Sequence, residues 1–364
     1  MKQWNAIRRW AIAQLEISHG IHSPLRPMEG LRGLAVFLVF LVHYTSLIEP
    51  WSSTVSRLPS FIGHVGNLGV DLFFILSGFL IYGTIITKDY FQFSDYAKRR
   101  IRRIYPTFLV VFSMYIVLSF VFPNESKIPS ASGDALIYII QNLLLLPGLL
   151  DVSPIVTVAW SLSYEVFYYL LIPLLVLAFS MKKWSSNLRI SVWLTVSVVG
   201  FSLVYLYGGH VRLLMFVAGI ILFECYKIKN IKLKWFGTSS FILSLFLYGF
   251  RDVFNINPIA SFVIVFVLFF MFCLSAFTTE SRSSKWLTYS PLRWLGNMSY
   301  SYYLIHGLVL KALFIILPVV MPPSDYGLLV YFVLLAPFFI ITMMGGFVLF
   351  VVVERPLSIA KKIN

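Results

Sequence analysis

The sequence predicts an all-α polytopic membrane protein with about ten transmembrane helices and both termini in the cytoplasm. Composition is the first observation behind this prediction, because 59% of the 364 residues are hydrophobic and only 12% are charged. The second is the length of the apolar runs, since a helix needs roughly 20 apolar residues to cross a hydrocarbon core of about 30 Å. Ten segments meet this requirement, approximately residues 31–50, 67–87, 104–122, 160–180, 190–208, 211–226, 235–250, 258–278, 295–317 and 327–353.

The third observation is the placement of the basic residues. The formal net charge is +14, and 24 of the 29 Lys and Arg residues fall on one side of the membrane if the N-terminus is cytoplasmic. This is the positive-inside pattern of membrane proteins, so the charge indicates membrane lipids as partners and argues against nucleic acid. Five basic residues fall outside the inner set: Arg57, Lys127, Arg212, Arg251 and Lys311.

Three of the segments outside the predicted spans are assigned separately. Residues 1–25 have no long apolar core typical of a signal peptide, so we expect a cytoplasmic amphipathic segment on the membrane surface. Residues 123–159 are assigned to an outer excursion with a re-entrant or interfacial helix, because another crossing there would move the lysines of residues 227–234 outside. We expect residues 357–364 to form a cytoplasmic tail and residues 26–356 to form one membrane domain.

The first span carries two ionisable residues in the stretch LRGLAVFLVFLVHY. Arg32 and His43 are eleven residues apart, so they share one face of a helix at a separation of roughly 16 Å along its axis. Glu29 joins this face one turn before Arg32. Ionisable groups within membrane segments are costly and therefore indicate a functional site. The alternative for His43 is a hydrogen-bonded packing residue.

Other spans place polar groups at similar depth. Asp71 lies in GVDLFFILSGFLI, with Gly78 two turns further on the same face, where a neighbouring helix or a ligand can approach closely. Trp160, Ser161 and Glu165 open the fourth span. His306 lies in the ninth span, LGNMSYSYYLIHG. The alternatives are a helix cap for Asp71, a helix-dipole partner for Glu165 and a packing role for His306.

A cluster of arginines opens the third span in KRRIRRIYP, where Pro106 is expected near the helix start. The cluster consists of Arg99, Arg100, Arg102 and Arg103. Guanidinium groups bind phosphates well, so this end of the span is a candidate anion site. The alternative is a topology signal that also anchors anionic lipids. The two cysteines show no metal-ligand or disulfide spacing, and no metal is predicted.

Together these motifs resemble the membrane acyltransferase-3 family. Its opening signature, an arginine followed by ten residues and a histidine, is matched by RPMEGLRG (residues 26–33) and His43, although Glu29 stands where aspartate is common. The segments GVDLFFILSGFLI, RRIRRIYP, WSLSYEVFYY and the closing Glu-Arg-Pro of residues 354–356 are similar to its other motifs. The resemblance extends from about residue 26 to 356.

The resemblance implies an O-acyltransferase, commonly an O-acetyltransferase, in the inner membrane of a bacterium. The implied donor is cytoplasmic acetyl-CoA or another acyl-CoA. The implied acceptor is a hydroxyl of an extracytoplasmic or lipid-linked carbohydrate, as in the biosynthesis of lipopolysaccharide or exopolysaccharide. Some members carry a fused extracytoplasmic hydrolase-like domain that this sequence lacks, so we expect the membrane domain or a separate partner to handle the acceptor.

We expect His43 to act as the general base, with Asp71 or Glu165 orienting its ring. The coenzyme phosphates are expected at Arg32, Arg99, Arg100, Arg102 and Arg103. Further candidate site residues are Arg26, Glu29, Trp160, Ser161 and His306. A covalent acyl-enzyme on Ser77, Ser161 or Ser163 is the second chemical route. A transporter or flippase for an envelope precursor is the alternative function.

Overall fold

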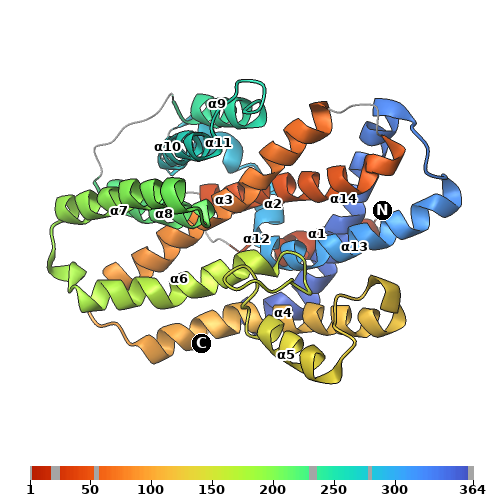
Figure 1. The fold of residues 1–364 in the computed structure, drawn as a ribbon, viewed down its shortest axis with the longest axis horizontal. Helices are drawn as coiled ribbons and strands as arrows, with labels where there is room; N and C mark the ends of the chain where they lie inside the picture. The colour runs from red at the N-terminus through yellow and green to blue at the C-terminus, as the bar shows by residue number, and fades with distance from the viewer. Residues whose placement is uncertain (1, 18–24, 53–56, 229–235, 278–280, 360–364) are drawn as a thin grey trace.

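The structure is a computed structural model that describes residues 2–17, 25–52, 57–228, 236–277 and 281–359. Within these ranges the regular secondary structure is helical and no strand forms (Figure 1). The prediction of an all-α membrane protein is therefore confirmed. The lysines of residues 229–234, which helped to orient the chain, lie outside the described residues.

In the described ranges, eight helices are long and apolar enough to cross a membrane, judged by length and composition. They are α2 (Leu25–Ile48), α3 (Arg57–Ile86), α4 (Phe93–Val121), α6 (Ala159–Ala178), α7 (Ser186–Tyr207), α10 (Pro258–Ala276), α13 (Ser299–Val320) and α14 (Gly327–Leu349), the last continued by a π-helical segment, Phe350–Ile359. The two other predicted spans form α8 (Leu214–Lys227) and α9 (Phe236–Gly249), with 14 residues each. At 1.5 Å per residue these reach about 21 Å. Ten crossings and two cytoplasmic termini therefore stay predictions.

Four shorter helices are α1 (Lys2–Leu15), α5 (Ser132–Leu143), α11 (Arg282–Leu287) and α12 (Ser290–Asn297). The helix α5 lies in the segment predicted as an outer excursion. Asn142 at its end ties the excursion together, because its amide donates to the carbonyl of Ser153 at 3.3 Å and accepts from the Ile155 amide at 2.7 Å. The chain then leads directly into α6 (Figure 1).

The start of α4 differs from the prediction. The helix begins at Phe93, eleven residues before the predicted span, and Pro106 lies inside it rather than near its start. The expectation for Pro106 was therefore wrong. The helix extends through the arginine cluster because charged residues can continue a helix that leaves the apolar core, and Pro106 removes only one backbone donor. The arginines thereby occupy fixed positions on a helical surface.

Glycines allow α3 and α8 to touch through their backbones. A Cβ atom at Gly78 would collide with the carbonyl oxygen of Phe216, and one at Gly219 would collide with that of Ile75. Small residues that permit such close approach are typical of helix contacts in membranes. The close approach predicted at Gly78 is thus made by a neighbouring helix.

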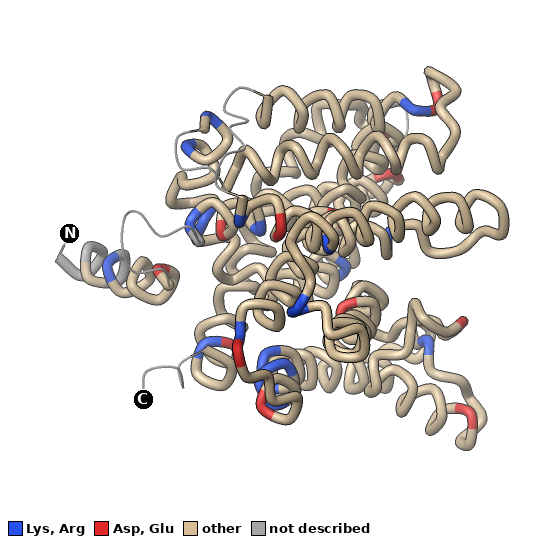
Figure 2. Tube along the Cα trace, turned by 90° about the vertical axis from the view of Figure 1, so that its left-hand side faces the viewer, with Lys and Arg blue, Asp and Glu red and all other residues tan. Residues whose placement is uncertain are grey.

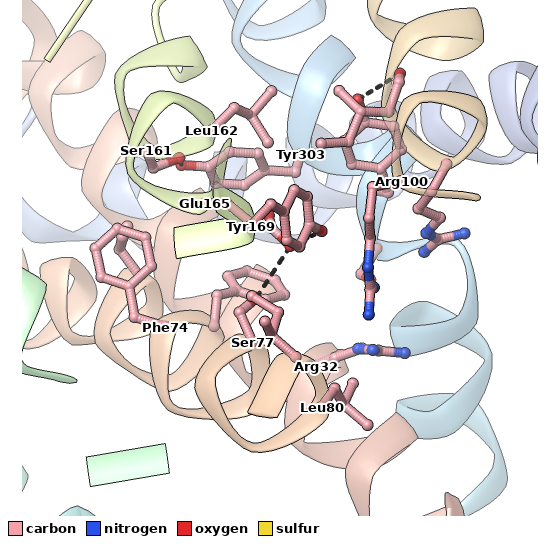
Figure 3. Close-up of a pocket in the computed structure, with 17 residues that line it drawn as sticks. Arg32, Phe74, Ser77, Leu80, Arg100, Ser161, Leu162, Glu165, Tyr169 and Tyr303 are labelled. Atoms are coloured by element: carbon pink, nitrogen blue, oxygen red, sulfur yellow. Dashed lines mark hydrogen bonds between the residues drawn. The ribbon is translucent and has the colours of Figure 1, made fainter. Parts of the chain in front are cut away.

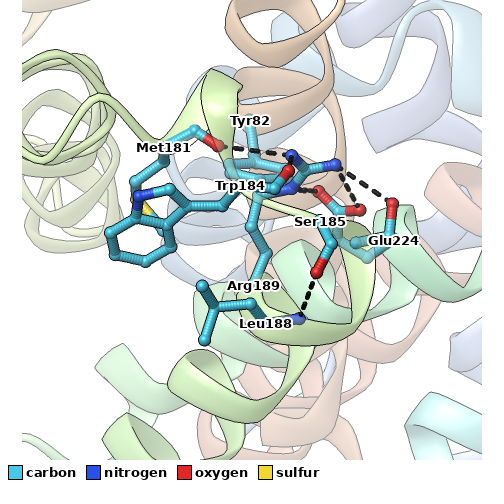
Figure 4. A network of polar contacts seen from close by, with 8 residues as sticks. Tyr82, Met181, Trp184, Ser185, Leu188, Arg189 and Glu224 are labelled. Carbon is cyan, nitrogen blue, oxygen red and sulfur yellow. Dashed lines mark hydrogen bonds and ion pairs between the residues drawn. The ribbon is translucent and has the colours of Figure 1, made fainter.

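A buried ion pair joins α7, α8 and α3 (Figure 4). Arg189 of α7 donates to both oxygens of Glu224 of α8, at 2.6 and 3.1 Å, and Tyr82 of α3 donates to the same carboxylate at 2.6 Å. Arg189 also donates to the backbone carbonyl of Trp184 at 2.6 Å. Glu224 is fully buried, so its charge depends on these partners.

Lys and Arg residues gather toward one end of the bundle, and fewer lie at the opposite end (Figure 2). This asymmetry agrees with the charge distribution along the sequence. We refer to the two ends as the predicted inner and outer ends.

Candidate active site

The arginine pocket is a cavity of about 120 Å³ between α2, α3, α4, α6 and α13. Its polar lining includes Arg32 from α2, Arg100 and Arg103 from α4, and Glu165 from α6. Aromatic and aliphatic side chains form the remaining wall. The structure therefore brings together residues from four of the sequence motifs.

Three guanidinium groups meet in this pocket under different constraints. Arg103 is held by Glu354, which accepts its Nη1 at 2.8 Å and is fully buried. Arg100 lies over the rings of Tyr96 and Tyr169, with its Cζ 5.1 and 4.9 Å from their centroids. Such stacking orients the cation and leaves its edge N–H groups available.

Arg32 makes no hydrogen bond or ion pair with another residue of the described ranges. Its guanidinium and that of Arg100 face the same space in the pocket (Figure 3). A guanidinium group that lines a pocket and forms no ion pair with a protein carboxylate is available to an anionic ligand.

Glu165 lies beside these cations and accepts two hydrogen bonds. Ser77 of α3 donates to its Oε1 at 3.2 Å, and Tyr169 donates to the same oxygen (Figure 3). Across the pocket the hydroxyl groups of Ser161 and Tyr303 share a hydrogen bond of 2.7 Å. The pocket thus offers hydroxyl donors close to a carboxylate and to guanidinium groups.

His43 does not line the arginine pocket but is linked to it through a line of rings. The ring of Tyr303, which lines the pocket, lies 6.0 Å from that of His306, and the rings of His306 and His43 are 5.1 Å apart between centroids. His43 makes no hydrogen bond with another described residue. The predicted contact with Asp71 or Glu165 is therefore not formed in this structure.

His306 has one fixed tautomer. Its Nδ1 lies 3.1 and 2.9 Å from the carbonyl oxygens of Tyr302 and Tyr303. Carbonyl oxygens only accept, so Nδ1 carries the proton and Nε2 holds the lone pair of a neutral ring. Nε2 is buried and has no hydrogen-bond partner within the described residues.

Asp71 belongs to a different contact. Its Oδ2 accepts the Nη1 of Arg212 at 2.7 Å, and the carboxylate is fully buried between α3 and the start of α8. Arg212 is one of the five basic residues outside the predicted inner set. Its exceptional position in the charge count was the signal that could have identified it as the partner of a buried acid.

The remaining predicted residues lie outside the arginine pocket. Arg99 is exposed, and Arg102 donates to the carbonyl of Leu357 at 3.0 Å. Arg26 and Glu29 form ion pairs near the predicted inner end, with Glu16 at 3.8 Å and with Arg293 at 2.9 Å. Trp160 packs edge-on against Phe74.

Sequence reasoning missed Glu354 as a site residue. Besides Arg103, its carboxylate accepts the backbone amide and hydroxyl of Ser301 at 3.0 and 2.6 Å. The only signal was its place in the closing Glu-Arg-Pro motif. Tyr169, the last residue of the WSLSYEVFYY motif, was likewise not singled out, although its ring lies under Arg100.

The structure is thus a helical membrane bundle with a pocket in which guanidinium groups lie beside a carboxylate, with a pair of histidines nearby. The family model described as "Acyltransferase domain" matches residues 27–352, and the chain belongs to this family.

The chain is similar to three bacterial proteins. It is 26% identical to O-acetyltransferase OatA of Staphylococcus aureus over 322 residues, which cover 79% of this chain and 51% of that protein. It is 27% identical to peptidoglycan O-acetyltransferase OatA of Listeria monocytogenes over 77% of this chain and 48% of that protein. It is also 27% identical to the putative peptidoglycan O-acetyltransferase YrhL of Bacillus subtilis, over 78% and 48%.

The chain spans about half the length of these relatives. No solved structure matches it.

Proposed function

We propose that the protein is an O-acyltransferase that moves an acyl group, foremost acetyl, from acyl-CoA to a hydroxyl of an envelope carbohydrate. The observation that carries this proposal is the arrangement of Arg32 and Arg100, which turn toward one pocket beside Glu165. Family membership supports acyl transfer as the reaction class. The relatives named for peptidoglycan make this glycan the first acceptor to test, ahead of lipopolysaccharide or exopolysaccharide.

The donor is proposed to enter from the cytoplasm. Coenzyme A carries phosphates at one end, and guanidinium forks recognise phosphate oxygens with paired hydrogen bonds. Arg32 and Arg100 would hold these phosphates, and Arg103 would add positive potential while it stays paired with Glu354. Arg99 and Arg102 lie outside the pocket and would act at its approach.

In the direct route, His43 removes the proton of the acceptor hydroxyl as its oxygen attacks the thioester carbonyl carbon. The C–O bond forms and the C–S bond breaks, and the coenzyme thiolate leaves with the proton that the imidazolium returns. Tyr303, and Ser77 once its hydroxyl turns away from Glu165, would stabilise the negative charge on the carbonyl oxygen. Arg32 and His43 both lie on α2, about 16 Å apart, and the pantetheine arm would bridge them.

Coenzyme binding tests this function. The protein is purified in nanodiscs, and coenzyme A binding is measured by calorimetry for the wild type, Arg32→Gln, Arg100→Gln and a control, Lys98→Gln. Lys98 lies exposed on α4, so its replacement removes one positive charge without touching the pocket. We expect each arginine variant to bind 10- to 100-fold more weakly, equivalent to about 1.5–3 kcal/mol for a charge-assisted hydrogen bond.

Unchanged affinity in both arginine variants, or a wild type that does not bind coenzyme A, would overturn the proposal. The second result favours an exporter, which has no need of the coenzyme. Mass spectrometry of envelope glycans from a deletion strain and its complemented counterpart then identifies the acyl group and its position.

A further inference from the structure

A second cavity, of about 340 Å³, lies beyond the arginine pocket toward the predicted outer end. We call it the outer cavity. Its lining includes Tyr115 from α4, Thr157 from the segment before α6, and Gly307 and Lys311 from α13. Lys127 from the excursion also lines it. Neither the family match nor the relatives' names assign a role to it.

The outer cavity and the arginine pocket are built on the same elements. On α13, Gly307 follows Tyr303 of the arginine pocket by four residues, and ahead of α6, Thr157 precedes Ser161 by four residues. On α4 the outer cavity begins at Tyr115, eleven residues after Ile104. The two cavities therefore succeed each other along one line of helices.

His306 lies at the boundary between the two cavities. It immediately precedes Gly307, and its ring contacts Tyr303 on one side and His43 on the other. Its Nε2 is buried and has no hydrogen-bond partner within the described ranges. Neither histidine lines the outer cavity; Gly307, next to His306 in the chain, is the part of its wall that adjoins the histidine pair.

The mouth of the outer cavity is positively charged. Lys311 pairs with Glu125 at 2.6 Å, while Lys127 donates to the backbone carbonyl of Pro154 at 3.0 Å. Two lysines against one carboxylate leave a net positive charge. Both lysines are exceptions to the positive-inside pattern, so topology does not account for them. Most of the remaining lining is apolar and includes Leu118 and the exposed side chains of Phe122 and Ile315.

We propose that the outer cavity is the acceptor site and that it binds an anionic carbohydrate with an apolar portion. A carboxylate or phosphate of the acceptor meets Lys127 and Lys311, and the reacting hydroxyl lies near Tyr115 and Gly307, facing the histidine pair. This inference rests on the proposed acyl transfer and specifies the acceptor's chemistry. The anionic group can belong to the glycan itself or to a lipid phosphate that carries it.

Gly307 provides a substitution that fills the cavity without disturbing the helix. A Cβ atom there would meet only the Tyr115 hydroxyl, at 3.8 Å, and a leucine would extend into the cavity. Gly63 on α3 is the matched control, because a Cβ atom there meets nothing within 4 Å and the residue lines neither cavity. For the charge, Lys127→Gln and Lys311→Gln are compared with Lys182→Gln, whose Nζ donates to the Lys88 carbonyl.

The experiment measures binding of three probes to the protein in phosphatidylcholine nanodiscs. The probes are a muropeptide with free carboxylates, an undecaprenyl-pyrophosphate disaccharide, and a neutral N-acetylglucosamine oligomer. We expect at least one anionic probe to bind at least tenfold more tightly than the neutral oligomer. Lys127→Gln, Lys311→Gln and Gly307→Leu should each weaken it at least tenfold, and Gly63→Leu and Lys182→Gln less than twofold. The tighter of the two anionic probes identifies a glycan carboxylate or a lipid phosphate as the group recognised.

Three results would overturn the inference. In the first, the wild type binds the anionic probes no more tightly than the neutral oligomer. In the second, the cavity variants bind the probes like the wild type, and in the third, added phosphatidylglycerol in the nanodiscs abolishes probe binding. The last result would make the cavity a lipid site. Coenzyme A affinity is measured on the same variants and should be unchanged, so a failure of this inference is distinguishable from a failure of the proposed function.

Discussion

His43 of α2 and His306 of α13 are 263 positions apart in the sequence, yet their imidazole rings lie 5.1 Å apart between centroids. One ring has its tautomer fixed by two backbone carbonyls, and the other has no hydrogen bond to a described residue. If the His43 ring rotates so that its N–H points at the Nε2 of His306, which has no partner among the described residues, the two rings can share a hydrogen bond. We expect this neighbour, rather than a carboxylate, to orient the candidate base.

The histidine pair leads to the first prediction. We expect His43→Ala to lower kcat by about 10²- to 10⁴-fold, the usual contribution of a general base. His306→Leu should lower kcat about tenfold and alter its pH profile, with the KM for acyl-CoA unchanged, because only the acceptor beside His43 is lost. His306→Gln restores an acceptor at a similar position and should recover part of the rate. A wild-type pH profile in His306→Leu would show that the histidine serves packing alone.

Ser77 distinguishes the two chemical routes. Its hydroxyl donates to Glu165 at 3.2 Å, an arrangement that would suit a nucleophile, whereas an oxyanion donor would first have to release Glu165. Direct transfer predicts that Ser77→Ala loses about tenfold in kcat, and that intact-protein mass spectrometry after incubation with acyl-CoA detects no acyl adduct. Complete loss of transfer in Ser77→Ala, together with an adduct on the wild type, would support the covalent route.

The pairing of Asp71 with Arg212 gives a third prediction. Removing one partner leaves a buried charge without compensation, so Asp71→Asn and Arg212→Gln should each destabilise the fold by about 3–5 kcal/mol. Both should lower the Tm by similar amounts and leave the KM for acyl-CoA unchanged at temperatures where the variants are folded. If instead Asp71 orients His43, Asp71→Asn would reduce kcat at such temperatures and Arg212→Gln would not.

Arg189 and Glu224 serve as a structural comparison far from the proposed chemistry, because neither residue lines the arginine pocket or the outer cavity. Glu224→Gln should lower the Tm with kcat and KM unaffected in the folded fraction. The double variant Arg189→Met with Glu224→Leu removes both charges and should recover much of the lost stability, as replacement of a buried pair often does. Thermal melting in nanodiscs measures both effects. A double variant no more stable than Glu224→Gln would contradict this account.

The sequence predicted the helices better than it predicted the contacts between side chains of different helices. The helices were predictable because apolar runs and helical periodicity are local properties. The start of α4 was not, since the arginine cluster has no apolar periodicity and Pro106 suggested a boundary that the helix does not have. Arg32 and His43 do share one continuous helix, as their spacing predicted. The predicted carboxylate partner of His43 did not appear, because spacing within one helix carries no information about the facing helix.

By itself, the sequence determined the all-α membrane class, the segments that become helices, the family resemblance and the residue types available for chemistry. Tertiary structure alone decided which of them meet. Arg103 finds Glu354 across 251 positions, Asp71 finds Arg212 across 141, and Arg32 stays available to a ligand. The physical reason is that helix formation depends on neighbours within a few turns, whereas the pairing of buried charges depends on how whole helices pack. Close backbone contacts such as Gly78 against Phe216 fix that packing.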